Sequence, residues 1–191
     1  MKIILASTSL YRRQLLERFR LPFDTARPET DETARPGEHP PALAERLAQE
    51  KAVAVAGGHP DALIIGSDQV AHSGDDIFGK PGTVERAVAQ LQRMSGREVV
   101  FHTAVALLNS RTGHIRCAGI PTRVRFRTLT DDEIRRYVET EMPLDCAGSA
   151  KSEGLGISLL EALSGDDPTA LIGLPLIALA DMLRAEGVQI P

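Results

Sequence analysis

The chain opens with a short apolar run that gives way to a helical pattern of apolar residues. Residues 3–6 are Ile, Ile, Leu and Ala, and an unbroken apolar run of this kind is typical of a strand buried on both faces. Hydroxyl residues follow at 7–9, and helices favour Ser and Thr as N-caps. Apolar residues then recur at helical spacing within 11–19. The pattern predicts a strand, a polar turn and a helix, in that order.

Apolar periodicity predicts the later elements in the same way. Helical stripes indicate helices over about 41–56, from about 83, after the capping box at 130–133 and after Pro175. Apolar or alternating runs indicate strands at 62–66, 99–108 and 122–128, with 113–118 pairing with the second of them as a hairpin. Loops or turns are expected in the proline-rich segment 24–41 and in the glycine-rich segments 74–82 and 145–160.

The order of these elements indicates the fold class. Strands and helices alternate early in the chain, and a long strand pair lies in its middle. Such an order favours an α/β fold with a mixed sheet. No shift in composition and no linker divides the sequence, so we expect residues 1–191 to form one domain.

Composition and charge narrow the classes of partner. Hydrophobic residues make up 42% and charged residues 25% of the chain, which fits a folded soluble protein. Because 22 basic and 26 acidic side chains give a net charge of −4, long nucleic acids are not expected as partners. The apolar runs are too short for a signal peptide or a membrane helix, and the two cysteines lack a CxxC spacing. We therefore expect a cytoplasmic protein with reduced cysteines and no membrane partner.

The segment after the first predicted strand has the chemistry of an anion site. Ser7 and Ser9 stand where a helix begins, and the backbone N–H groups of a helix N-terminus suit phosphate. Arg12 and Arg13 add planar cationic groups that match phosphate oxygens. The alternative is a capped surface helix with exposed arginines.

Two acids and two lysines extend this chemistry. Asp68 follows the strand predicted at 62–66, where a carboxylate would hold a divalent metal or accept a proton from water, although a turn or N-cap Asp would look the same. Glu32, in a proline-rich loop, suits either a metal or plain solvation. Lys51 continues an apolar helical stripe, so it points into a cleft or runs along the surface. Lys80 lies in a tight turn from which it would reach a phosphate.

The segment 74–81 nearly matches a P-loop but departs from it. Pro81 stands where the motif needs Ser or Thr to bind Mg²⁺, and it also removes a backbone N–H from the phosphate cradle. No long buried strand leads directly into Gly74. A kinase or ATPase of the P-loop type is therefore disfavoured. The chain also lacks a GxSxG motif and an arguable Cys–His pair, which disfavours a covalent enzyme intermediate.

A further glycine-rich segment, 147–156, carries Lys151 and Glu153. It suits either the close approach of a ligand or a plain loop. Taken together, the basic, hydroxyl and acidic residues point to phosphate ester or anhydride chemistry on a small nucleotide.

Several short motifs occur in order over nearly the whole chain. They are LASTSxxRR at 5–13, DE at 31–32, AQEKA at 48–52, IIGSDQV at 64–70, GKP at 79–81, AGSxKSEG at 147–154 and GLPL at 173–176. This set resembles the Maf family of nucleoside triphosphate pyrophosphatases. The resemblance implies an elongated α/β fold similar to inosine triphosphate pyrophosphatases, with helices flanking a mixed sheet and a central cleft between two lobes. It also implies a cytoplasmic enzyme that uses a divalent cation, Mg²⁺ or Mn²⁺, and often forms a homodimer.

The resemblance implies roles for single residues. The proton-accepting aspartate of the family falls on Asp68, and Glu32 would join it in holding a metal. The cations that would neutralise the phosphates and the leaving pyrophosphate are Arg12, Arg13, Lys51 and Lys80. Ser7 and Ser9 would bind the substrate beside them.

Three positions resemble the subgroup of the family that acts on 7-methyl-GTP. That subgroup has an aromatic residue, Gln and Glu where this chain has Tyr11, Gln69 and Glu153, whereas the dTTP and UTP subgroup has Arg, Thr and Gln. N7-methylated guanine is cationic, so an aromatic ring and a carboxylate complement it. The chain departs from the pattern at Tyr11, where Trp is usual, and at Leu10, where Pro is usual. Lys151, two residues before Glu153, would serve the phosphates.

We therefore expect hydrolysis of a nucleoside triphosphate, with 7-methyl-GTP as the substrate, between its α and β phosphates. The products would be the nucleoside monophosphate and pyrophosphate. One alternative is a dTTP or UTP pyrophosphatase of the same family. Another is a nucleotide-binding regulator of cell division with incidental turnover. An intact Asp68 favours the enzyme, because binding alone gains nothing from an acid that faces phosphates.

Overall fold

The apolar runs of the sequence pair into one mixed sheet. A computed structural model of the protein describes residues 1–74 and 76–191. Its strands are β1 (Lys2–Ala6), β2 (Asp24–Ala26), β3 (Ala62–Ser73), β4 (Asp76–Phe78), β5 (Glu98–Asn109), β6 (Ile115–Phe126) and β7 (Leu160–Ser164). Its α-helices are α1 (Leu10–Glu17), α2 (Pro40–Ala56), α3 (Val84–Met94), α4 (Asp131–Glu141) and α5 (Leu176–Ala185), and two 3₁₀ turns are η1 (Ala147–Ser149) and η2 (Leu155–Leu159).

The strands form a seven-stranded sheet in the order β2-β1-β3-β5-β6-β7, with β4 beside β3. Strand β1 runs parallel to β2 and β3, whereas β3, β5, β6 and β7 pair antiparallel in sequence. The predicted α/β fold with a mixed sheet is therefore confirmed.

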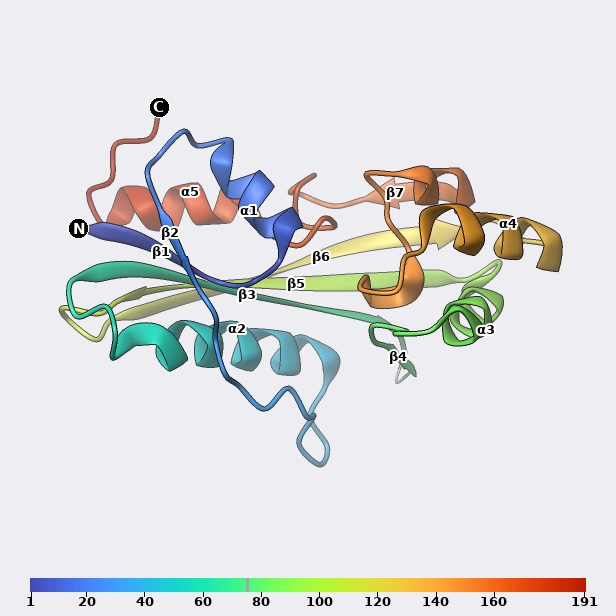
Figure 1. Ribbon diagram of the computed structural model, residues 1–191, viewed down its shortest axis with the longest axis horizontal. Coiled ribbons are helices and arrows are strands. Elements are labelled where there is room, and N and C mark those ends of the chain that lie inside the picture. Colours follow the sequence, from blue (N-terminus) through green and yellow to red (C-terminus); the bar gives the residue numbers. More distant parts are fainter. Residues whose placement is uncertain (75) are drawn as a thin grey trace.

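Three long strands, β3, β5 and β6, run from one lobe of the molecule into the other (Figure 1). The first lobe holds both termini, with α1 and α5 on one face of the sheet and α2 on the other. The second lobe carries α3 and α4. The expected elongated fold with two lobes is thus confirmed. The three long strands connect the lobes and lie across the region between them.

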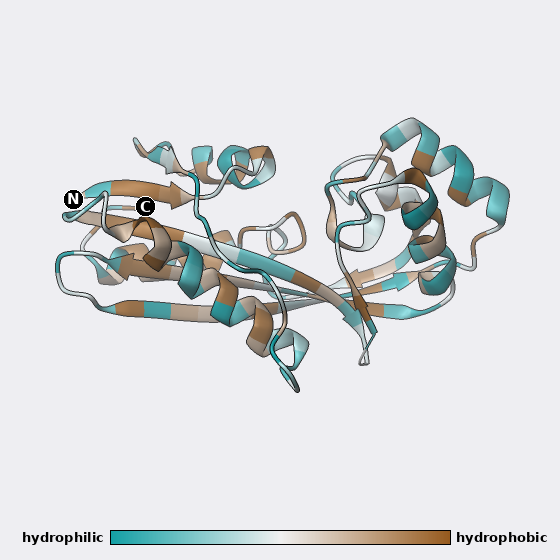
Figure 2. Ribbon diagram, turned by 60° about the horizontal axis from the view of Figure 1, so that its bottom comes forward, coloured by the Kyte–Doolittle hydropathy of each residue, from teal (hydrophilic) through white to brown (hydrophobic). Residues whose placement is uncertain are grey.

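Each face of the sheet has its own core. Apolar residues of α1 and α5, such as Leu16 and Leu183, pack against β1, β3 and β5. On the opposite face, Ala48 and Ala52 of α2 lie among buried residues of the same strands. A separate cluster around Phe101 fills the second lobe. In Figure 2, β1 is apolar over most of its length, while the helices alternate between apolar and polar residues.

Helix α2 approaches the sheet closely at one glycine. A Cβ atom added to Gly66 of β3 would collide with the carbonyl oxygen of Ala48 and lie 2.9 Å from the backbone nitrogen of Ala52. Only glycine permits this approach, and the small residues of α2 allow it from the other side. The contact places Lys51, also on α2, next to the strand that carries Asp68.

The strand predicted at 62–66 is longer than its apolar run. Strand β3 pairs with β5 without interruption from Leu63 to His72, so Asp68 lies inside a strand and not beyond its end. The polar residues of 67–69 remain in the sheet because their backbones complete the ladder with β5. The prediction that Asp68 follows a strand was therefore wrong.

Other predicted boundaries also change. The strands expected at 113–118 and 122–128 form one strand, β6, which pairs with β5 along its length. The expected loop 24–41 contains β2, and the expected turn 74–82 contains β4, although its Asp75 lies outside the described residues. The capping box at 130–133 opens α4 as predicted. In the described parts of the chain, no helix has both the length and the hydrophobicity that crossing a membrane requires.

Candidate active site

A cavity of about 780 Å³ opens between the two lobes. It is large enough for a nucleotide-sized ligand. The turn from β1 to α1, the loop around Glu32, α2, β3, the segment after β4 and the segments 145–153 and 171–173 all contribute to its wall. The predicted site residues that line it are Ser7, Ser9, Tyr11, Arg12, Glu32, Lys51, Asp68, Gln69, Lys80 and Glu153. The expected central cleft is thus present and collects residues from far apart in the sequence.

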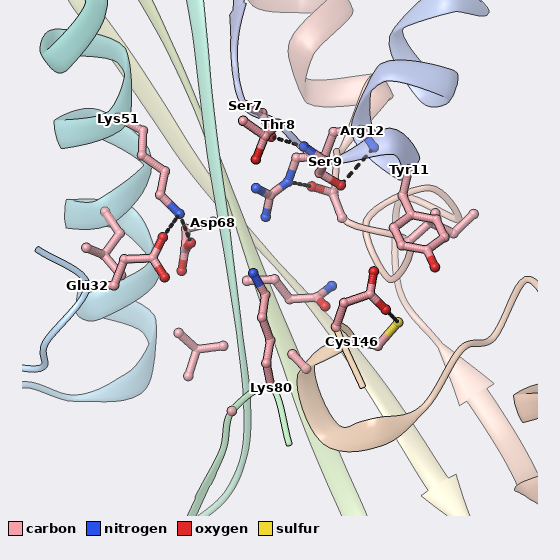
Figure 3. Close-up of a pocket in the computed structure, with 18 of the residues that line it drawn as sticks. Ser7, Thr8, Ser9, Tyr11, Arg12, Glu32, Lys51, Asp68, Lys80 and Cys146 are labelled. Atoms are coloured by element: carbon pink, nitrogen blue, oxygen red, sulfur yellow. Dashed lines mark hydrogen bonds and ion pairs between the residues drawn. The ribbon is translucent and has the colours of Figure 1, made fainter. Parts of the chain in front are cut away.

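Lys51 lies between two carboxylates on one side of the cleft (Figure 3). Its Nζ is 2.6 Å from Oδ1 of Asp68 and 2.6 Å from Oε1 of Glu32. The residue is only 6% exposed, so it does not run along the surface. Burial raises the pKa of Glu32, but the hydrogen bond and charge of Lys51, with the charges of Lys80 and Arg12, outweigh burial and lower that pKa overall. Two carboxylates thus share one ammonium group.

The two carboxylates offer ligands for a divalent cation. Both reach the same nitrogen atom, so their oxygens converge on a small space. Mg²⁺ is commonly held by one or two carboxylates together with substrate phosphates and water. Glu32 and Asp68 fit such a role when phosphates supply further ligands. Within residues 1–74 and 76–191, no group of three or more His, Cys, Asp or Glu side chains is arranged to hold a metal ion.

The turn before α1 presents polar groups to the cleft. Ser9 caps the helix by accepting a hydrogen bond from the backbone N–H of Arg12, and Ser7 accepts one from the N–H of Ser9. The Nε of Arg12 donates to the carbonyl oxygen of Gly173 at 2.9 Å, with the guanidinium turned toward the cleft (Figure 3). Burial lowers the pKa of Arg12, while the carboxylates of Asp68 and Glu32 raise it.

Two predicted residues form ion pairs with residues outside the cleft wall. Arg13 lies outside the cleft wall and pairs with Glu17 at 3.2 Å on the exposed side of α1. Lys151 also lies outside the wall, with its Nζ 2.8 Å from Glu141 of α4. That contact raises the pKa of Lys151, and burial opposes the rise. The phosphate roles expected for these two residues thus have no support from the geometry.

Tyr11 and Glu153 lie at the end of the cleft near segment 145–153. The Nζ of Lys151 stands 5.6 Å from the centre of the Tyr11 ring. Burial raises the pKa of Tyr11, and nearby Cys146 and Asp145 add to the rise. Burial and Asp145 also raise the pKa of the Cys146 thiol to about 12, so the thiol stays neutral.

Sequence reasoning missed several residues of this site. Asp145 and Cys146 line the cleft beside Tyr11, although their segment read only as a glycine-rich loop. Gly173 holds Arg12 and Glu141 holds Lys151, each from a distant segment. The GLPL motif at 173–176 was a signal for the first of these, since it had no other assigned role. Nothing in the sequence pattern singled out Glu141.

Comparisons with known proteins show the family of the chain. A family model described as "Maf-like protein" matches residues 2–186. A relative from Aromatoleum aromaticum named 7-methyl-GTP pyrophosphatase is 70% identical over 190 residues, which cover 100% of this chain and 98% of the relative. A protein of the same name from Thiobacillus denitrificans is 57% identical, over 98% of this chain and 94% of the relative. Another, from Xanthomonas axonopodis pv. citri, is 60% identical, over 100% of this chain and 99% of the relative. With the family model spanning both lobes and the cleft between them, the chain belongs to the Maf-like protein family.

Proposed function

We propose that the protein hydrolyses a nucleoside triphosphate between the α and β phosphates and that 7-methyl-GTP is its preferred substrate. The observation that carries the proposal is the buried Lys51, held between Glu32 and Asp68 at 2.6 Å from each, in one cavity with Arg12. The relatives named 7-methyl-GTP pyrophosphatase, up to 70% identical over the full chain, support both the reaction and the substrate.

We assign Asp68 as the group that accepts a proton from the attacking water. Lys51 contacts its Oδ1, which leaves the other carboxylate oxygen to accept a proton from water. The oxygen of that water bonds to one phosphorus of the α–β anhydride, and the bridging oxygen leaves with the other. Lys51 holds the Asp68 carboxylate in place, and Glu32 in turn holds Lys51. A divalent cation, Mg²⁺ or Mn²⁺, bound by Glu32 and Asp68 would supply charge neutralisation at the phosphates.

The remaining cations and hydroxyls suit the triphosphate. Arg12 presents the terminal nitrogens of its guanidinium to the cleft, and Lys80 approaches from the segment after β4 (Figure 3). The turn at Ser7 and Ser9 adds the N-terminus of α1, whose dipole favours anions. These groups stabilise the charge that develops on the leaving pyrophosphate.

The opposite end of the cleft suits a cationic base. Asp145 and Glu153 line it, while the charge of Lys151 is balanced by Glu141. The Tyr11 ring offers a face for stacking. The cleft is therefore acidic at the end assigned to the base and basic at the end assigned to the phosphates, which matches 7-methyl-GTP, a molecule with a positive base and a negative triphosphate.

Replacement of Asp68 tests the reaction. Pyrophosphate release is measured on 7-methyl-GTP, dTTP, UTP and inosine triphosphate with Mg²⁺ or Mn²⁺. We expect Asp68→Asn to lower kcat by about 10²–10⁴, the usual cost of losing a general base. Nucleotide binding should fall less, because Arg12 and the lysines remain. Asp24→Asn, on exposed β2, is the matched control and should keep full activity.

The same panel distinguishes the other functions. An Asp68→Asn variant within threefold of the wild type would remove Asp68 from the mechanism. Faster turnover of dTTP and UTP than of 7-methyl-GTP would point to the pyrimidine branch of the family. Tight binding with no pyrophosphate release would favour a nucleotide-binding regulator, and orthophosphate as the main product from ATP would favour an ATPase.

Cellular setting and assembly are also proposals. We propose a cytoplasmic homodimer, which suits a substrate made inside the cell and two free cysteines, Cys117 and Cys146. Sedimentation of the purified protein gives the mass in solution and tests the dimer.

A further inference from the structure

The segment between β7 and α5 is tied to the centre of the sheet by polar side chains. Ser67 Oγ lies 2.9 Å from the carbonyl oxygen of Gly173, and Thr103 Oγ1 lies 2.8 Å from that of Ala170. Gln69 Nε2 donates to the carbonyl oxygen of Leu171 at 2.9 Å. We call residues 167–176 the strap. The three side chains come from adjacent positions of β3 and β5, so they hold the strap at three carbonyls.

These polar side chains are costly to bury unless they are paired. Ser67 and Thr103 are both 0% exposed, and they lie among the apolar residues of the sheet. Gln69 Nε2 also donates to Thr103 Oγ1 at 2.9 Å, which links the two strands. Hydroxyl and amide groups at the centre of a sheet are not needed for the β3–β5 ladder, since the backbones complete it. Ser67 Oγ also lies 2.8 Å from the carbonyl oxygen of Ala104 on β5, so its one proton is shared between β5 and the strap. The partners that these side chains have outside the sheet are all carbonyl oxygens of the strap, which indicates that they fix it.

The strap is also braced internally. Thr169 Oγ1 is 2.8 Å from the carbonyl oxygen of Leu174 and accepts a hydrogen bond from the backbone N–H of Leu176. Asp167, 3% exposed, accepts hydrogen bonds from Thr169 and from the N–H of Ile177 at the start of α5. A buried turn with this many internal bonds holds its carbonyls in fixed positions.

One of those carbonyls meets Arg12. The carbonyl oxygen of Gly173 accepts from Arg12 Nε at 2.9 Å and also lies 2.9 Å from Ser67 Oγ. Gly173 has a φ of +126°, which favours glycine, and a Cβ there would lie 3.6 Å from Arg12 Nε. A guanidinium has five N–H donors, so fixing Nε leaves the four on its terminal nitrogens for the cleft.

We propose that the strap is a positioning element for Arg12, and that Ser67 and Thr103 are positioning residues that act through it. This inference rests on the proposed function, because it assigns Arg12 to the phosphates. It gives the GLPL motif a role, in which Gly173 supplies the oriented carbonyl. It also gives Gln69 a second task, since its amide nitrogen is engaged by the strap and Thr103 and is not free for the base.

A double-mutant cycle tests whether Ser67 works through Arg12. Ser67→Ala removes the hydroxyl, and Arg12→Lys keeps the charge but loses the Nε donor. We expect Ser67→Ala to lower kcat/KM by roughly tenfold to a hundredfold in the wild type, the effect of a small misplacement of a catalytic group. In the Arg12→Lys background the same change should cost less than about twofold. Equal losses in both backgrounds would overturn the proposal.

Thr103 provides a second, independent pair of variants. Thr103→Val keeps the shape but lacks the hydroxyl, so it should weaken catalysis, whereas Thr103→Ser keeps the hydroxyl and should restore most of it. Ser110→Ala is the matched control, because Ser110 Oγ also binds two carbonyl oxygens, that of His59 in a loop and that of Ala62 at the start of β3, outside the cleft wall. It should lower stability without changing kcat/KM. A Thr103→Ser variant as impaired as Thr103→Val would count against the strap.

A binding measurement separates this proposal from the proposed function. Calorimetry with inorganic triphosphate reports on the phosphate end of the cleft without turnover. Ser67→Ala and Thr103→Val should weaken this binding by about tenfold, while Ser110→Ala and Thr103→Ser retain it. If the wild type and the variants bind triphosphate as expected but the wild type releases no pyrophosphate from any nucleotide, the proposed function fails. The positioning role of the strap is then still supported. If nucleotides are hydrolysed and Ser67→Ala matches the wild type in both assays, the positioning role of the strap is refuted and the proposed function is not.

Discussion

Glu153 reaches the cleft beside Tyr11 from the segment that precedes η2. This segment is fixed by α4, because Glu141 pairs with Lys151 and also accepts the backbone N–H of Leu155 at 2.7 Å. Glu153 itself lies between these two anchors and makes no catalytic contact with Lys51 or Asp68. Its position therefore suits selection of the base and not the chemistry at the phosphates.

We expect Glu153→Gln to lower kcat/KM on 7-methyl-GTP selectively. The change removes the charge that complements a cationic base and one of two acceptors for its donor pair. Because Glu153 is exposed to solvent in the free protein, water weakens its charge, and we expect a loss in kcat/KM of only about tenfold. Activity on dTTP and UTP, whose bases lack that donor pair, should change less than about twofold.

The control for this prediction is Glu161→Gln, which changes an exposed acid on β7 outside the cleft. It should leave activity on every nucleotide unchanged. An equal fall on all four nucleotides with Glu153→Gln would instead make Glu153 part of the catalytic or metal-binding machinery.

Single residues also mark the limit of sequence reasoning about the site. Asp68, Lys51 and Arg12 were identified from residue type and from motifs, and all three line one cavity. Lys151 was assigned to the phosphates from its charge and its place in the glycine-rich segment. Its partner, Glu141, comes from a different helix, so no local pattern could have revealed the pairing.

Among the elements, α2 and β3 together place the buried side chain of Lys51 against Asp68. Their close approach depends on Gly66, whose added Cβ would collide with the backbone of α2 at Ala48. The collision involves main-chain atoms, which cannot rotate away as a side-chain tip can. A larger residue must therefore push α2 outward and carry Lys51 with it.

We expect Gly66→Ala to destabilise the protein by about 1–3 kcal/mol, the cost of overpacking a core. For a domain of this size the melting temperature should fall by roughly 2–4 °C per kcal/mol. Activity should fall further than stability explains, since Lys51 would leave Asp68. Thermal unfolding and pyrophosphate release measure the two effects.

Gly57→Ala is the matched control in the same helix. Gly57 caps α2 with a φ of −60°, and nothing lies within 4 Å of an added Cβ. Its melting temperature should match or slightly exceed that of the wild type, because Ala restricts the unfolded chain. A Gly66→Ala protein as stable and active as Gly57→Ala would contradict the packing argument.

Elements were predictable where burial alone decides them. Strand β1 and the four longer helices follow apolar patterns that are visible in the sequence. The strand predicted at 62–66 ended too early because Ser67, Asp68 and Gln69 resemble a turn in isolation. In the fold, β5 completes their backbone hydrogen bonds, and the strap accepts from the side chains of Ser67 and Gln69, so tertiary partners override local propensity.

At the scale of the whole molecule, the long strands β3, β5 and β6 connect two lobes with separate cores. The fold class followed from the order of elements, and the resemblance to a known family supplied the two lobes. The composition of the cleft did not follow from either, because its wall combines segments from residue 6 to residue 173. Only the folded chain brings these segments together.

Ionised acids stabilise both lobes. In the first lobe, hydrogen bonds from the side chain of Arg46 and from the backbone of Arg35 lower the pKa of Glu38 to about 2. The Nε of Arg46 lies 2.6 Å from Oε1 of Glu38. In the second, the side chain of Lys151 and the backbone N–H of Leu155 lower the pKa of Glu141. Each acid releases its proton more readily in the folded chain than in the unfolded chain, where the pKa of a Glu carboxyl has its ordinary value of 4.5.

The sign of the pH dependence follows from these shifts. Below pH 4.5 the unfolded chain binds more protons than the folded one, so the free energy of unfolding should rise with pH from about 2 to about 5 and then level off. The contribution of Glu38 is complete above pH 4.5 and is lost as the pH falls toward 2. Glu38→Gln should therefore flatten the rise in this window, whereas Glu161→Gln, on exposed β7, should leave it intact. Urea unfolding at several pH values between about 2 and 6 measures the slopes. If Glu38→Gln and the wild type show parallel curves below pH 4.5, the Arg46–Glu38 pair does not contribute to acid stability.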